Sequence, residues 1–94
     1  MPTVQGSAEF FAIFGDQTRL RLMQALAEKP HRVGELVALT GEAQPAISHS
    51  LKTLRDAGVV TSSKSGRWVT YHIDAPKVRE ALKRHTAWLE EGVA

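Results

Sequence analysis

The chain has 94 residues, no cysteine and a formal net charge of +2. A chain of this length forms one small domain and buries only about 60–65% of its unfolded surface, so dimerisation is one way to enlarge the core. The absence of cysteine excludes disulfides, thiolate metal ligands and cysteine nucleophiles. No segment approaches the ~20 apolar residues of a membrane span and no signal-peptide pattern is present, so we expect a cytoplasmic protein.

The first predicted element is a short aromatic helix. Residues 1–6 are predicted to be disordered, and Ser7 is the expected N-cap of the helix that follows. Its phenylalanines are Phe10, Phe11 and Phe14. So dense an aromatic group predicts either ordinary core or a contact between two copies of the chain, because a short helix on a small domain has little to pack against.

Two further helices follow. Asp16 is a good N-cap for a second helix that ends near Ala27, and a short third helix covers residues 33–39 with Leu36 and Val37 inward. The predicted apolar stripe of the second helix consists of Leu20, Met23, Leu26 and Ala27. Two arginines lie off this stripe, on a face suited to solvent or to a phosphate: Arg19 and Arg21. No role is assigned to His31 in the loop before the third helix.

The fourth predicted helix, residues 44–57, has two contrasting faces. Its expected buried face consists of Ile47, Leu51, Leu54 and Ala57, and Gly58 is a typical C-terminal stop. The side chains expected at the surface near DNA bases are Gln44, Ala46, Ser48, His49 and Lys52. Short polar groups approach base edges closely, glutamine pairs with adenine, and lysine reaches guanine or phosphate. Paired with the third helix, this segment predicts a helix-turn-helix.

Residues 59–63 and 67–73 alternate as two strands of a hairpin, separated by a basic tip. Gly66 supplies the positive φ that a tight turn needs, and Lys64 and Arg67 flank it. Residues 44–73 contain four basic side chains and one acidic side chain, Asp56, so the positive charge of the chain is concentrated here. We therefore expect Lys64 and Arg67 to contact the flanking backbone or the minor groove of DNA.

A last helix is predicted over residues 75–91, capped by Asp74. Its apolar stripe, at helical spacing, is Val78, Ala81, Leu82, His85, Trp88 and Leu89. Together with Phe10, Phe11 and Phe14, the residues Val78, Leu82, His85, Trp88 and Leu89 are the expected dimer interface. His85 is either a hydrogen-bonded histidine at that interface or part of a nonstandard metal or proton site with Asp74, Glu90 or Glu91 of another chain.

Four segments, in this order and spacing, resemble the ArsR/SmtB family of bacterial regulators: DQTRLRL at 16–22, EL at 35–36, AISHSLKTL at 46–54 and GRWVTYHI at 66–73. The resemblance implies a mainly α winged helix-turn-helix domain over residues 1–94, with five helices and a two-stranded wing. It also implies a homodimer, built through the first and last helices, that binds an inverted repeat in promoter DNA as a repressor in the bacterial cytoplasm.

The chain departs from the metal-sensing members of that family. Val37 and Leu39 stand where thiolate sensors have cysteine, and Pro76 stands where other members have histidine. We therefore expect no cofactor, no metal and no small-molecule ligand, with a nonstandard metal site at the dimer interface as the alternative. A protein-interaction module is a further alternative, although it predicts an apolar or acidic face on the fourth helix. No nucleophile motif, paired carboxylates or glycine-rich phosphate loop suggests an enzyme.

Overall fold

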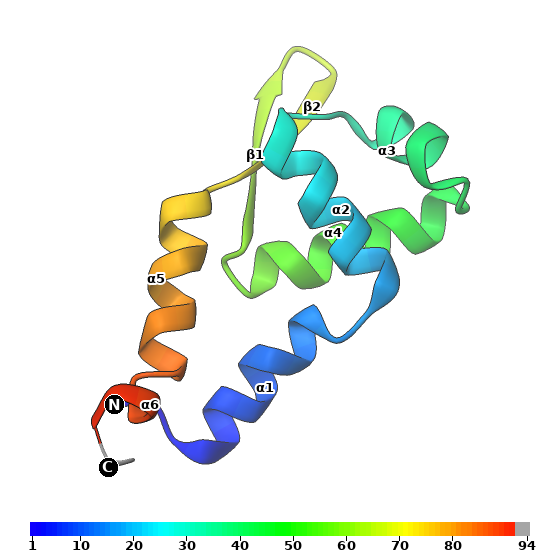
Figure 1. Cartoon of the computed structure of the whole chain (residues 1–94). Helices are drawn as coiled ribbons and strands as arrows, with labels where there is room; N and C mark the ends of the chain where they lie inside the picture. Colours follow the sequence, from blue (N-terminus) through cyan, green and yellow to red (C-terminus); the bar gives the residue numbers. More distant parts are fainter. Residues whose placement is uncertain (92–94) are drawn as a thin grey trace.

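The computed structural model describes residues 1–91. In that range the chain forms six helices and one antiparallel hairpin (Figure 1). The elements in chain order are α1 (Val4–Phe14), α2 (Gln17–Glu28), α3 (Val33–Thr40), α4 (Gln44–Asp56), β1 (Val60–Ser65), β2 (Trp68–Ile73), α5 (Ala75–His85) and α6 (Trp88–Glu91). The predicted class, mainly helical with a small hairpin, is confirmed.

The core lies between α2, α3, α4 and the start of the hairpin. Its fully buried apolar side chains are Leu22, Leu26, Leu36, Ile47, Leu51, Leu54, Val59 and Val60. Burial of each of the larger ones contributes about 1.5–3 kcal/mol. These contacts fix α3 and α4 as a helix-turn-helix against α2, with β2 packed on the same body.

The cap predicted at Asp16 is confirmed, because its carboxylate accepts a hydrogen bond from the Arg19 backbone N–H at 2.9 Å. The Arg19 side chain turns back to α1 and donates to the carbonyls of Ile13 at 2.8 Å and Ala12 at 3.1 Å. The Ala12 carbonyl also accepts from the Gly15 N–H at 3.2 Å, so Arg19 completes the hydrogen bonding at the C-terminal end of α1, where helix carbonyls lack regular helical partners. Asp74 likewise accepts from the Lys77 N–H at 3.1 Å and caps α5.

Two predictions for the first helices are wrong. The first helix begins at Val4 rather than after Ser7, because Thr3 Oγ1 accepts from the Gly6 N–H at 2.9 Å and caps it. Residues 4–6 are therefore helical. The buried face of α2 is formed by Leu22 and Leu26, whereas Leu20 is 41% exposed.

The single last helix that the apolar stripe predicted is interrupted. The helix α5 ends at His85, and a separate short helix, α6, follows. At the break, Thr86 Oγ1 donates to the Leu82 carbonyl at 2.7 Å, and Trp88 Nε1 donates to the His85 carbonyl at 3.1 Å. The Thr86 hydroxyl adds to a regular helical bond, because the Thr86 N–H also donates to the Leu82 carbonyl at 3.1 Å. The Leu89 N–H donates to the Thr86 carbonyl at 2.9 Å, so the Trp88 side chain takes the place of the regular bond to the His85 carbonyl. Six helices therefore replace the expected five within residues 1–91.

The helices α1 and α5 extend away from the body and come together near the N-terminus and α6 (Figure 1). The molecule is accordingly elongated, with extents of 51 × 23 × 20 Å. Neither α1 nor α5 has a fully buried residue, in contrast to α2, α3 and α4. Within residues 1–91 no helix is both long and apolar enough to cross a membrane.

Candidate nucleic-acid interface

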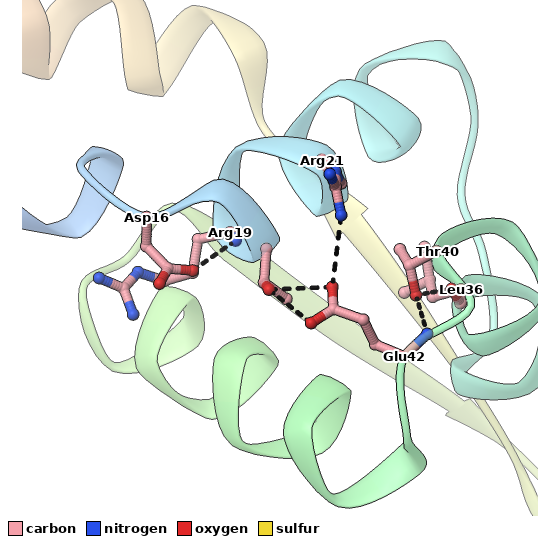
Figure 2. Close-up of polar contacts among 7 residues, drawn as sticks. Asp16, Arg19, Arg21, Leu36, Thr40 and Glu42 are labelled. Carbon is pink, nitrogen blue, oxygen red and sulfur yellow. Dashed lines mark hydrogen bonds and ion pairs between the residues drawn. The ribbon is translucent and has the colours of Figure 1, made fainter.

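The turn between α3 and α4 is held by a polar network (Figure 2). The turn begins at Gly41, which has the positive φ of +71° that favours glycine. Thr18 Oγ1, on α2, donates to the Glu42 carboxylate, at 2.8 Å from one oxygen and 2.9 Å from the other. Arg21, also on α2, lies 4.0 Å from the same carboxylate. Glu42 therefore links the turn to α2 just before α4 begins.

A second set of bonds fixes the same turn from the side of α3. Thr40 Oγ1 donates to the Leu36 carbonyl at 2.8 Å and accepts from the Glu42 N–H at 3.2 Å (Figure 2). The start of α4 is thus attached to both preceding helices. The orientation of the exposed face of α4 depends on these attachments as well as on the apolar contacts beneath it.

The predicted division of α4 into two faces agrees with the burial of its side chains. Ile47, Leu51 and Leu54 are buried, together with Ser50, whereas Ala57 is exposed, contrary to expectation. The five residues predicted to approach bases are all exposed: Gln44, Ala46, Ser48, His49 and Lys52. A rigid helix with a short-side-chain polar surface suits insertion into a major groove.

Lys52 is engaged by its own helix. Its Nζ donates to Asp56 Oδ2 at 2.8 Å, one turn further along, and both side chains are largely exposed. The hydrogen bond from Lys52 is the main cause that lowers the pKa of Asp56, with the charges of Lys52 and Arg55 adding to it. Asp56 therefore neutralises part of the positive charge on this face.

The hairpin β1–β2, called the wing below, has a two-residue turn. Ser65 pairs with Trp68, so Gly66 and Arg67 alone form the connection, and Gly66 has φ of +61° as predicted. A glycine at the first turn position with a negative φ at the second matches the type II′ turns that suit the twist of hairpins. Lys64 and Arg67 are exposed at this tip.

The wing is joined to the body through His31, to which sequence reasoning gave no role, and the contact is made at Tyr71 in the middle of β2. His31 and Tyr71 exchange two backbone hydrogen bonds, of 3.1 and 2.8 Å. The His31 side chain is only 4% exposed, and its Nδ1 lies 2.7 Å from the Lys29 carbonyl, to which it must donate. A single bridging residue before a helix has no periodic pattern that could have revealed it.

The predicted dimer residues lie on α1, α5 and α6. His85 stacks on Phe10, with ring centroids 4.1 Å apart, and its Nδ1 is 2.8 Å from Ser7 Oγ. Phe11 and Phe14 lie in the same aromatic group. Of the remaining residues, two are half-buried, Val78 and Leu82, and two are more than half exposed, Trp88 and Leu89.

Family, sequence and structure comparisons all relate this chain to bacterial and archaeal regulatory proteins. Residues 16–62, which are half of the chain and run from the α2 cap into β1, match the model of the arsR family of bacterial regulatory proteins. The uncharacterized HTH-type transcriptional regulator MJ1325 of Methanocaldococcus jannaschii is 38% identical over 84 residues, covering 88% of this chain and 94% of that protein.

A transcriptional repressor SmtB homolog of Synechocystis is 41% identical over 87 residues, covering 93% of this chain and 66% of the relative. Among solved structures, the crystal structure of Rv0081 from Mycobacterium tuberculosis superposes with a TM-score of 0.77 at 33% identity, covering 96% of this chain and 91% of that one. The sequence match, the helix-turn-helix and the wing agree, and this chain belongs to the arsR family of bacterial regulatory proteins, which are DNA-binding transcriptional regulators rather than enzymes.

Proposed function

We propose that the chain is a homodimeric repressor that binds an inverted repeat in promoter DNA. The observation that carries this proposal is the exposed polar face of α4, opposite its buried apolar face and followed by a basic wing tip. The repressor role is supported by the Synechocystis relative, which is described as a repressor. A repressor of this kind acts by occupying promoter DNA.

The roles of the DNA-facing residues follow from their chemistry. Gln44, Ser48 and His49 approach base edges, while Lys52 reaches a base or a phosphate after leaving Asp56. Ala46 permits close approach to the groove because its side chain is a single methyl group. Lys64 and Arg67 contact the flanking phosphates, and each such contact releases counterions, so binding weakens as salt rises.

The dimer proposal rests on the apolar surface that α1, α5 and α6 leave uncovered in one chain. Phe11 on α1 is 38% exposed, and Trp88 and Leu89 on α6 are 55% and 56% exposed. The helices α1 and α6 lie on the side of the molecule away from α3 and the wing (Figure 1). A second copy packed on this side would bury them. Two α4 helices in a dimer would then meet successive major grooves, about 34–36 Å apart on one side of the duplex.

The DNA part of the proposal is tested by fluorescence anisotropy with a labelled duplex of the protein's own promoter region and a scrambled duplex of equal length. We expect wild-type protein to prefer the promoter duplex. The Lys52→Ala, Arg67→Ala double variant should bind both duplexes more weakly at moderate salt. Equal binding by the parent and this double variant would overturn the proposed roles. Arg79→Ala, on the exposed side of α5, is the matched control for a lost charge.

The dimer part is tested separately by sedimentation. Leu82→Asp places a charge in the apolar face of α5 and is expected to give a folded monomer that binds promoter DNA weakly. Arg79→Asp places the same charge on the exposed side of the same helix and should remain dimeric. A Leu82→Asp variant that sediments as an unchanged dimer would contradict the proposed interface.

A further inference from the structure

Two arginines from distant parts of the sequence lie against one tryptophan ring. Trp68 is the first residue of β2 and is 49% exposed. The Cζ atom of Arg32 lies 4.3 Å from the centroid of this ring, and that of Arg67 lies 5.1 Å from it. Both distances are within the range in which a guanidinium is attracted to the π face of tryptophan.

The backbone beneath each arginine is fixed. Arg32 is the N-cap residue of α3, and its N–H donates to Glu35 Oε1 at 2.8 Å. This hydrogen bond is the main cause that lowers the pKa of Glu35. Arg67 occupies the two-residue turn of the wing, directly before Trp68. The tryptophan ring therefore brings together one cation from the body and one from the wing.

The location of this pair connects the two proposed DNA-contacting elements. Arg32, Arg67 and Trp68 line one surface hollow together with Gln44, the first residue of α4, and Glu35. Among the side chains that the structure describes, in residues 1–90, the ion pairs are Arg21 with Glu42 and Lys52 with Asp56, so no carboxylate is within ion-pair distance of either guanidinium. Glu35 lies in the same hollow and offsets part of the charge, but two arginines against one carboxylate leave the hollow positive. A positive hollow favours an anion, and the guanidinium fork suits a phosphate especially well.

We propose that Trp68 holds Arg32 and Arg67 as a pair that binds a DNA backbone phosphate beside the bases approached by Gln44. Arg32 is then a DNA-contacting residue, and Trp68 is a positioning residue that acts through the two arginines. The proposal rests on the function proposed above and adds to it a contact from the start of α3. It also makes the grip of the wing depend on a residue of the body.

The test is the salt dependence of DNA affinity, measured by anisotropy with the promoter duplex and the scrambled duplex. The slope of log affinity against log salt is negative, and for Arg32→Ala we expect it to become shallower by about 0.9, the value for one lost phosphate contact. Affinity should fall by roughly the same factor for both duplexes, because a phosphate contact carries no base information. The Arg79→Ala control should leave both the slope and the affinity unchanged.

The positioning role of Trp68 is tested by a double-mutant cycle. Trp68→Leu keeps both arginines but removes the aromatic face, so Arg32→Ala should weaken binding less in that background than in the parent. Trp68→Phe retains an aromatic face and should retain most of the coupling. Circular dichroism of every variant shows whether it is folded. If Trp68→Leu is unfolded, Trp68→Thr takes its place, because threonine also lacks an aromatic face and suits a strand.

The outcomes separate the two proposals. If Arg32→Ala has the slope and affinity of the parent while Arg67→Ala has a shallower slope and a lower affinity, the pair is only a stabilising contact near the tip of the wing and the inference is wrong. If the parent binds the promoter duplex no better than the scrambled one, the sequence-specific function fails, whereas a reduced slope for Arg32→Ala on both duplexes would still support the phosphate contact.

Discussion

The link between Thr18 and Glu42 gives the most direct test of how the helix-turn-helix is held. In Thr18→Val the hydroxyl that donates to the Glu42 carboxylate is replaced by a methyl group. The two oxygens, at 2.8 and 2.9 Å, share a single hydroxyl hydrogen, so the structure contains one hydrogen bond here rather than two. Valine and threonine have similar helix propensities, so α2 itself should be little affected.

The expected cost follows from the surroundings of the carboxylate. A hydrogen bond to a charged group contributes about 1.5–3 kcal/mol when water is excluded. The Glu42 side chain is 30% exposed, so water recovers part of this, and we expect a loss of about 1–1.5 kcal/mol. The Arg21 pair, at 4.0 Å with a 54% exposed arginine, should contribute at most about 0.5 kcal/mol.

The measurement is thermal unfolding by circular dichroism at one fixed protein concentration, because dimerisation makes the melting temperature depend on concentration. For a domain of this size, 1 kcal/mol corresponds to about 4–8 °C, so Thr18→Val should melt about 4–12 °C below the parent. Arg21→Ala should melt within about 4 °C of it. A Thr18→Val variant that melts with the parent, or an Arg21→Ala variant that is the more damaged of the two, would refute this reasoning.

Three other changes have distinct expected results. Asp56→Asn should tighten DNA binding about two- to fivefold by anisotropy, because it releases Lys52 and removes a negative charge from the DNA-facing side of α4. The pKa of Asp56 is lowered, so in the parent its ion pair with Lys52 persists at neutral pH and is lost only as the pH falls through that lowered pKa. An Asp56→Asn variant that binds DNA no more tightly than the parent at pH 7 would contradict the proposed effect of Asp56. In Gly66→Ala the added Cβ would meet nothing within 4 Å, but alanine is forced to a φ of +61° at a cost of about 1–2 kcal/mol, so this variant should bind DNA more weakly. The control is Gly34→Ala, which also adds a Cβ without close contacts but lies within α3. It should raise the melting temperature, because alanine favours a helix over glycine. Zinc, nickel and cobalt should leave promoter affinity unchanged, because Val37, Leu39 and Pro76 stand at positions where metal-sensing members of the family have cysteine or histidine ligands. Release of DNA by one equivalent of metal would contradict this expectation.

Buried and exposed positions were predicted most accurately in the helix whose apolar and polar residues separate clearly onto two faces. The faces of α4 were correct because Ile47, Leu51 and Leu54 are the only large apolar residues between its ends. In α2 the leucines are so numerous that helical spacing alone did not decide which face is buried. Packing against α3 and α4 buries Leu22 and leaves Leu20 exposed. The break after His85 was missed because the apolar stripe continues across it. The bonds that mark the break, from the Trp88 side chain to the His85 carbonyl and from the Leu89 N–H to the Thr86 carbonyl, leave no periodic signal in the sequence.

The candidate site was predicted in its elements but not in the contacts between them. Alternation placed Trp68 on the outer face of its strand, and an exposed tryptophan beside a basic turn was the available signal of a special role. Its partner could not be found in this way, because Arg32 is distant in sequence and precedes a different helix. Periodicity tells which face a side chain occupies, whereas only the tertiary structure tells what shares that face.

The connection between α2 and α3 determines where the wing stands relative to α4. His31 pairs with Tyr71 through the backbone, and the next residue, Arg32, lies against Trp68. Both contacts reach β2, at Tyr71 in the middle of the strand and at Trp68 beside the two-residue turn, so they attach the middle and the tip end of the wing to the start of α3. The start of α3 is itself fixed to α4 by the core and by the turn at Glu42. The position of the wing relative to α4, including the tip that carries Arg67, is therefore set by the body.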